Sequence, residues 1–143
     1  MGENDEVRSP DRPPPRRILV IEDNVDAAAV LRDVLEMQDA VTQVRVDDSL
    51  VNYALAIVRK TRESEFLSLG VSPRGSQMLY RAAQAMAFLE GRAYCTPEDF
   101  KPIAVAVFAH RVVVSSLYAS TLKKSEQSEQ VLREIVDSVA VPV

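Results

Sequence analysis

Two hydroxyl–proline pairs mark where helices begin in this chain. Ser72 and Thr96 are good N-cap residues, and each precedes a proline at the first helical position, where proline's missing N–H costs nothing. Apolar residues then recur at the spacing of one helix face. They are Leu79, Ala82, Ala83, Met86 and Leu89 after Ser72, and Phe100, Ile103, Ala104, Val107 and Phe108 after Thr96. Gly91 lies where a glycine ends the first of these helices.

The rest of the chain after residue 40 carries the same helical signal. Asp47 or Asp48 can cap a helix. One face of that helix holds Leu50, Tyr53, Ala54, Ile57 and Val58, and a last amphipathic helix holds Val131, Leu132, Ile135, Val136 and Val139. Residues 112–114 are predicted to be extended, and the polar residues 122–128 a loop. Aromatics make up 6% of the chain and Trp is absent, which favours helices packed on helices through small aliphatic side chains.

The N-terminal part has a different character. Residues 1–17 combine prolines with mixed charges and almost no apolar side chain, so they are predicted to form a disordered tail. Residues 18–21 are a short apolar run that fits a buried strand, and Asn24 or Asp23 can cap a following helix. We expect this strand to be peripheral, paired with residues 112–114 or with another chain. The predicted parts are the tail, a β-α fragment over residues 18–36, and a helical domain over residues 37–143.

The predicted fold is therefore mainly α, a small bundle of four or five helices with one short N-terminal β-strand. Charge and composition exclude several kinds of function. The net charge is −4 and no long basic run occurs, which argues against nonspecific nucleic-acid binding. The single Cys95 allows no internal disulfide and no cysteine metal cluster. No apolar stretch is long enough to span a membrane, and the N-terminus has no hydrophobic signal core, so we expect a cytoplasmic protein.

The start of the helix at Ser72 is a candidate anion site. Arg74 lies in its first turn, beside the positive end of the helix dipole, where a cation is electrostatically unfavourable. A free helix N-terminus with an added guanidinium suits a phosphate. Ser72, Arg74 and Gly75 are the candidate ligand-binding residues. The alternative is that Arg74 simply points into solvent.

Several motifs resemble, in order and spacing, the C-terminal lid of the MoxR branch of AAA+ ATPases. They lie between about residue 34 and residue 143, at residues 46–50, 58–62, 69–75, 81–85, 91–99, 110–112 and 131–136. The resemblance implies that Arg74 is the sensor-2 arginine, which reaches the terminal phosphates of ATP. It implies the AAA+ αβ domain and neighbouring ATPase subunits as partners, with ATP and Mg²⁺ bound only in the complete ATPase. That ATPase would act as a chaperone in client remodelling or metal insertion.

Residues 16–33 resemble the first strand and helix of a response-regulator receiver domain. In that family the acidic pair at the positions of Glu22 and Asp23 helps to hold Mg²⁺. Two carboxylates are too few ligands by themselves, and the later receiver strands are missing, so Glu22 and Asp23 are only weak metal candidates. The chain thus resembles a join of two unrelated fragments, a chimera, near residues 32–36.

The chain has no Gly-x-x-x-x-Gly-Lys-Ser/Thr loop and no Walker B strand beside one. We therefore expect no ATP hydrolysis and no tightly bound cofactor in the isolated chain. The leading hypothesis is a nucleotide-sensing lid module. The alternatives are a receiver-derived signalling module and a structural helical module that associates with itself through the lone strand.

Overall fold

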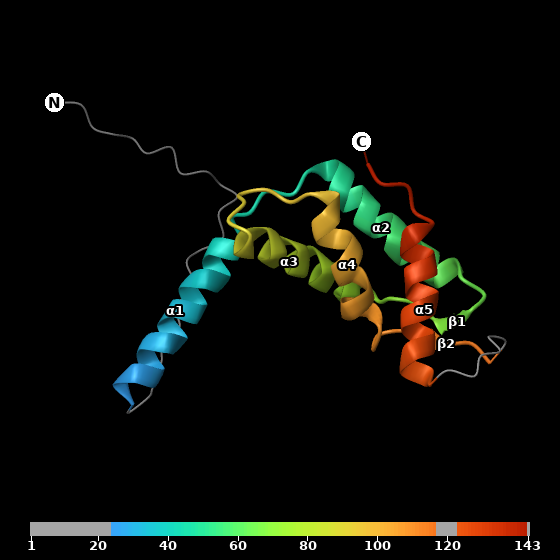
Figure 1. Cartoon of the computed structure of the whole chain (residues 1–143), viewed down its shortest axis with the longest axis horizontal. Helices are drawn as coiled ribbons and strands as arrows, with labels where there is room; N and C mark the ends of the chain where they lie inside the picture. Colours follow the sequence, from blue (N-terminus) through green and yellow to red (C-terminus); the bar gives the residue numbers. More distant parts are fainter. Residues whose placement is uncertain (1–23, 117–122, 143) are drawn as a thin grey trace. The chain divides into compact units, whose positions relative to one another are not determined.

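Side-chain caps set the starts of the helices in the computed structural model, which describes residues 24–116 and 123–142. The Asn24 side chain accepts hydrogen bonds from the N–H groups of Asp26 and Ala27, and the Asp47 carboxylate accepts one from Ser49 at 2.8 Å. The Ser72 hydroxyl accepts one from Gly75. The elements are α1 (Val25–Val41), α2 (Asp48–Glu63), β1 (Leu67–Leu69), α3 (Pro73–Leu89), α4 (Pro97–Phe108), β2 (Val113–Val114) and α5 (Lys124–Asp137) (Figure 1).

The mainly α prediction is confirmed, and so are the starts of α2, α3 and α4. The predicted tail and the strand at residues 18–21 lie outside the described residues. Gly91 follows α3 with a φ of 73°, a left-handed conformation that favours glycine, as its predicted role at the helix end requires. The predicted division at residues 36/37 falls inside α1 and stays a prediction.

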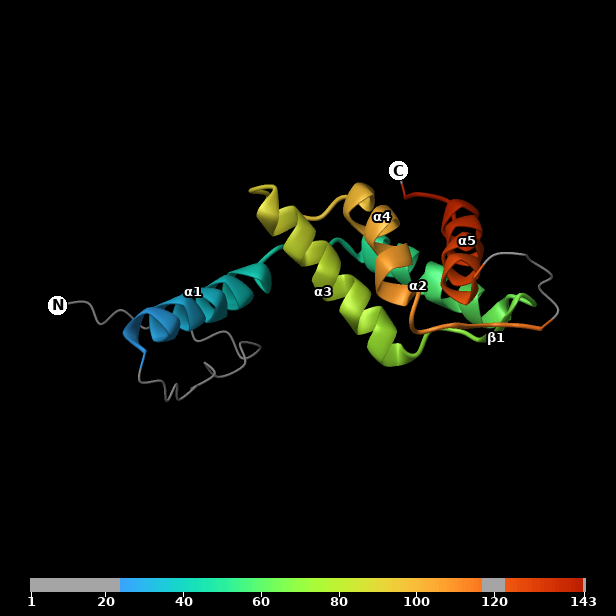
Figure 2. The ribbon, with the colours of Figure 1, turned by 60° about the horizontal axis from the view of Figure 1, so that its bottom comes forward.

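Two compact units divide the chain, Met1–Val34 and Leu35–Val143. The second unit holds a helical core in which α4 lies between α3 and α5, while α2 packs against α3, α5 and β1 (Figures 1 and 2). Its largest fully buried apolar side chains come from α2 to α5 and from the loop before α3. They are Phe100, Phe108, Ile57, Leu79, Leu132, Val71 and Val131.

Leu89 was predicted on the buried face of α3, but its side chain is 71% exposed. The buried face of this helix is centred on Leu79, Ala83 and Ala87. Leu89 is the last residue of α3 and lies about 200° around the helix from Ala87, on the side away from this last buried residue.

A small antiparallel sheet joins β1 and β2. Leu67 pairs with Val114 and Leu69 with Val113, with an irregularity between the two pairs. The predicted extended segment at residues 112–114 is confirmed at Val113–Val114, and its partner in the described part of the chain is β1. Three residues are too short for an alternating pattern to show, so β1 could not be predicted from the sequence.

The prediction of a loop over residues 122–128 is wrong from Lys124 onward, because α5 begins there. This first stretch is polar, but Lys, Glu and Gln are good helix formers and do not need burial to be helical. The Glu126 carboxylate also accepts a hydrogen bond from the Lys123 N–H at 3.2 Å, which supports the helix start. The predicted apolar face follows, with Val131, Leu132, Ile135 and Val136 buried.

Candidate phosphate-binding helix end

The loop before α3 is attached to the last turns of α2. The Val71 N–H donates to the Thr61 hydroxyl at 3.0 Å, and that hydroxyl donates in turn to the Val58 carbonyl at 2.7 Å. Arg62 Nε donates to the Val71 carbonyl at 2.7 Å. Thr61 and Val71 are fully buried, so these bonds are shielded from water. The start of α3 is thus held in a fixed position on α2.

Gly70 brings this loop unusually close to α2. A Cβ at this position would lie 2.7 Å from the Thr61 carbonyl oxygen and 2.8 Å from the backbone N and Cα of Arg62. These neighbours are backbone atoms of a helix and cannot rotate away. Glycine is therefore required for the contact that places Ser72 at the end of α2.

The first turn of α3 presents Arg74 to solvent. Pro73 occupies the first helical position, and the Gly75 N–H bonds to the Ser72 carbonyl at 2.9 Å and to its hydroxyl at 3.4 Å. Gly75 is buried, and a Cβ there would lie 2.5 Å from Cγ1 of Val71. Arg74 is exposed, and within the described residues its guanidinium forms no hydrogen bond or ion pair.

The electrostatics of this helix end favour an anion. The first turn of α3 contains no acidic residue, whereas the first turn of α4 contains Glu98 and Asp99. The partial positive charge of the α3 N-terminus is therefore left without a counter-charge from its own turn, and Arg74 adds a full positive charge. An arginine on a helix N-terminus can bind a phosphate through charge-assisted hydrogen bonds.

The fold also places Arg111 beside this turn. Its Cδ lies 3.8 Å from the position that a Cβ on Gly75 would occupy. Its Nε is buried and has no hydrogen-bond partner among the described residues. Arg62 and Arg111 were not predicted as members of one cluster with Arg74. No spacing rule could have found them, because they come from other elements that only the tertiary fold brings to the α3 N-terminus.

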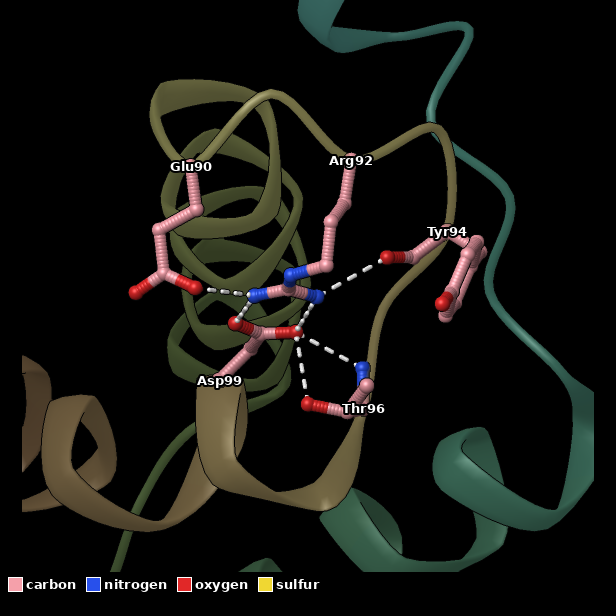
Figure 3. A network of polar contacts seen from close by, with 5 residues as sticks. All are labelled: Glu90, Arg92, Tyr94, Thr96 and Asp99. Atoms are coloured by element: carbon pink, nitrogen blue, oxygen red, sulfur yellow. Dashed lines mark hydrogen bonds and ion pairs between the residues drawn. The ribbon is translucent and has the colours of Figure 1, made fainter.

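A second polar cluster joins the end of α3 to the start of α4 (Figure 3). The Arg92 guanidinium donates to both carboxylate oxygens of Asp99, with Nη1 at 2.8 Å from Oδ2, and also to Glu90 at 2.7 Å and to the Tyr94 carbonyl at 3.0 Å. Asp99 Oδ2 accepts further bonds from the Thr96 N–H and hydroxyl. This cluster was not predicted, although Asp99 follows Thr96 at the spacing of a capping box.

The charges of this second cluster are balanced internally. Burial by itself would raise the pKa of Asp99, whose side chain is 3% exposed, but hydrogen bonds from Arg92 and Thr96 outweigh it and hold the pKa below its ordinary value. Hydrogen bonds to Asp99 and Glu90 raise the pKa of Arg92. Both groups are therefore charged at neutral pH and satisfied by each other. The cluster fastens two helices together and offers no unpaired group to a substrate.

Other candidate groups give no active site in the described part of the chain. Burial raises the pKa of the Cys95 thiol to about 11, so it is protonated at neutral pH. Glu22 and Asp23 lie outside the described residues, which themselves hold no group of three metal-ligand side chains. A cleft of about 550 Å³ between α4 and α5 is lined by Pro102, Val105 and Val136 among others, and by no residue of the α3 first turn. None of the helices described is long and apolar enough to cross a membrane.

Comparison with known proteins gives a family and several relatives. The AAA lid domain family matches residues 59–141. Protein YeaC of Bacillus subtilis is 41% identical over 111 residues, which cover 78% of this chain and 34% of YeaC. The chaperone MoxR1 of Mycobacterium tuberculosis is 29% identical over 119 residues, or 77% of this chain and 31% of MoxR1.

The fold of this chain is also similar to that of a solved structure. The crystal structure of a "putative ATPase" from Cytophaga hutchinsonii superimposes with a TM-score of 0.68 and 27% identity, covering 78% of this chain and 36% of that one. The chain spans about a third of the length of the curated relatives YeaC and MoxR1. The resemblance of residues 16–33 to a receiver domain lies before the matched family region and stays a prediction.

Proposed function

The chain belongs to the AAA lid domain family, and from this premise we propose that it is the nucleotide-sensing lid of a MoxR-type AAA+ ATPase. In this proposal Arg74 is the sensor-2 residue. It contacts the terminal phosphates of an ATP molecule that the αβ domain of the ATPase holds with Mg²⁺. The lid by itself is not an ATPase, because the chain contains no P-loop.

The observation that carries the proposal is the fixed position of the backbone from which the Arg74 side chain extends. Its helix begins at Pro73, two residues after Val71, whose backbone N–H and carbonyl are both bonded to α2. Because this backbone is already held by hydrogen bonds, the Arg74 guanidinium can reach a phosphate without a rearrangement of the loop before α3. Preorganised positive charge stabilises the negative charge that spreads over a transferring phosphoryl group. The exposed Arg74 therefore suits contact with a phosphate held by a second domain.

The attachment of the α3 start to α2 also explains how the lid could sense the bound nucleotide. A contact with the terminal phosphate exists with ATP and is lost after hydrolysis, so the nucleotide changes the preferred position of the lid. Since α3 is bonded to α2 and packs on α4, the lid core moves with Arg74 as one body. In the complete ATPase this movement would pass to neighbouring subunits and drive the remodelling of client proteins, a role consistent with the name of the chaperone MoxR1.

The test is ATP turnover by a graft in which residues 35–143 replace the matching segment of the "putative ATPase" from Cytophaga hutchinsonii. We expect Arg74→Ala to lower kcat by about 10²-fold, as removal of one transition-state donor does elsewhere. Arg74→Lys keeps the charge without the planar fork and should recover only part of the loss. Arg59→Ala removes another exposed arginine, on α2, and serves as the matched control. Unchanged turnover in Arg74→Ala would contradict the proposal.

A further inference from the structure

Helix α1 carries an apolar stripe that is exposed to solvent. None of its 17 residues, which all belong to the described part of the chain, is buried. The Val30, Val34 and Met37 side chains are 62%, 42% and 48% exposed. With two further apolar residues they form a line along the helix, which we call the α1 seam. Its members are Ala27, Val30, Val34, Met37 and Val41.

The spacing of the α1 seam is that of a coiled coil. Its members lie alternately three and four residues apart, so all of them share one side of the helix. This repeat keeps an apolar line facing a second helix along its length. The charged residues of α1 all lie off the seam. They are Asp26, Arg32, Asp33, Glu36 and Asp39.

A helix of this kind gains stability from contact with another helix. Isolated helices shorter than about 12–15 residues are marginal in water, and α1, with 17, is only slightly longer. Valine, which supplies three of the seam residues, has a lower helix propensity than alanine or leucine. Removal of the aliphatic side chains from water supplies the missing stability. A partner that covers the seam therefore also stabilises α1.

The polar residues beside the seam fit a second copy of the same helix. In a parallel coiled coil, Asp33 of one copy lies opposite Gln38 of the other. The Gln38 amide can donate to the Asp33 carboxylate, and two-fold symmetry makes this pair twice. In an antiparallel pair with matched apolar layers, Asp33 would face Ala40 and Gln38 would face Leu31, so both polar pairs would be lost. The flanks of α1 are thus complementary to themselves in the parallel arrangement.

We propose that the α1 seam is a dimerisation surface, on which α1 of a second copy of this chain packs in parallel. Each seam residue then packs on its own equivalent, Val34 on Val34 and Met37 on Met37. Valine at the alternate positions 34 and 41 is typical of two-stranded coiled coils. The proposal is independent of the role of Arg74, because no residue of the seam belongs to α3.

Sedimentation equilibrium of the full chain over a hundredfold range of concentration tests this surface. The mean mass should rise from that of one chain toward that of two. Val34→Asp places a charge in the middle of the seam and should weaken the dimer by about tenfold or more. Leu89→Asp is the matched control, because Leu89 is also apolar and exposed but lies at the end of α3, and it should leave the mass unchanged.

A second variant acts in the opposite direction. Leucine at the position of Met37 packs well in two-stranded coiled coils that have valine at the alternate positions. Met37→Leu should therefore tighten the dimer severalfold, a gain that a loss of folding could not produce. An unchanged or weaker dimer in Met37→Leu would count against the proposed seam.

A cysteine in the seam reports the orientation of the two helices. In a parallel dimer, two copies of Val30→Cys face each other and should form a disulfide under mild oxidation. In an antiparallel pair with matched layers they would lie about 16 Å apart along the axis, beyond the roughly 7 Å that a disulfide allows. Cys95 is 7% exposed and its thiol is protonated at neutral pH, so the wild-type chain serves as the control without a cross-link.

Each outcome bears on one part of the proposal. A monomer at every concentration, or equal masses of the wild-type chain and Val34→Asp, would overturn the dimerisation surface. A dimer that Val34→Asp dissociates but that Val30→Cys does not cross-link would overturn the parallel arrangement. A mean mass beyond that of two chains would contradict a two-stranded contact.

Discussion

The Val71 N–H donates a hydrogen bond to the buried hydroxyl of Thr61 across 3.0 Å, and this bond joins the loop before α3 to the last turns of α2. The same hydroxyl donates to the Val58 carbonyl, so it is fully used by the backbone on both sides. A threonine in the middle of a helical pattern thus has a structural purpose. It fixes the position of Val71, which directly precedes the Ser72 cap and the first turn that contains Arg74.

Thr61→Val tests this attachment directly. Valine has nearly the same shape, but it leaves the Val71 N–H buried without an acceptor. An unsatisfied buried donor costs about 1–3 kcal/mol, and we expect the free energy of unfolding to fall by that amount in urea titrations. Thr42→Val removes an exposed hydroxyl and should change stability by no more than about 0.5 kcal/mol. Equal stabilities of the two variants would show that the Thr61 bond is dispensable.

The fold could be predicted where local chemistry decides it. The starts of α2, α3 and α4 follow from Asp47, Ser72 and Thr96, because a capping side chain and a first-turn proline act within a few residues. The helical spacing also identified most of the core. Leu89 was placed wrongly because spacing alone does not fix the centre of the buried face, and β1 was missed because Leu67–Leu69 is extended through its pairing with β2.

The candidate site could be predicted only in part, for the same reason. Arg74 stands out because a cation in the first turn of a helix opposes the helix dipole. The contacts that hold the start of its helix join different elements, such as the Val71 N–H and the Thr61 hydroxyl, and no periodicity reports them. The capping-box spacing of Thr96 and Asp99 is visible in the sequence. The arginine that pairs with Asp99 could not be predicted from it, because Arg92 lies after the end of α3.

Gly75 and Val71 should be energetically coupled. A Cβ on Gly75 would lie 2.5 Å from Cγ1 of the fully buried Val71, so Gly75→Ala forces one of the two side chains to move. Overpacking of this kind costs about 1–3 kcal/mol, which exceeds the gain of roughly 0.5–1 kcal/mol from replacing a helical glycine. We expect Gly75→Ala to destabilise the chain, as measured by thermal and urea unfolding.

A double-mutant cycle identifies the cause of that loss. Val71→Ala removes the clashing methyl groups. The double variant should therefore be at least about 1 kcal/mol more stable than the sum of the two single stability changes predicts. Additive single effects would mean that the clash with Val71 is not what makes glycine necessary at this position.

The Arg92–Asp99 pair should make stability depend on acid pH. The pKa of Asp99 is lower in the folded chain than in the unfolded chain. The stability that Asp99 contributes is therefore complete above its pKa in the unfolded chain, about 3.9. This stability is lost as the pH falls through its lower pKa in the folded chain. Asp99→Asn should lower the free energy of unfolding at pH 7 by about 1–3 kcal/mol, because it removes a charged acceptor from a buried position.

Urea unfolding at a series of pH values checks this account. The difference between the wild-type chain and Asp99→Asn should shrink as the pH falls from 5 toward 2. Asp33→Asn, which replaces an exposed carboxylate on α1, should give a small difference that varies little with pH. A constant difference between wild type and Asp99→Asn at all pH values would contradict the role assigned to the Asp99 carboxylate.

The most direct measurement of the central claim is the nucleotide affinity of the Cytophaga hutchinsonii graft that carries this lid. Dissociation constants for Mg–ADP and for a non-hydrolysable Mg–ATP analogue are compared between the unmodified graft and its Arg74→Ala variant. If Arg74 contacts the terminal phosphate, the variant should bind the ATP analogue about tenfold more weakly and ADP with unchanged affinity. Equal affinities of both grafts for the ATP analogue, or an equal loss for both nucleotides, would contradict a lid that senses the terminal phosphate through Arg74.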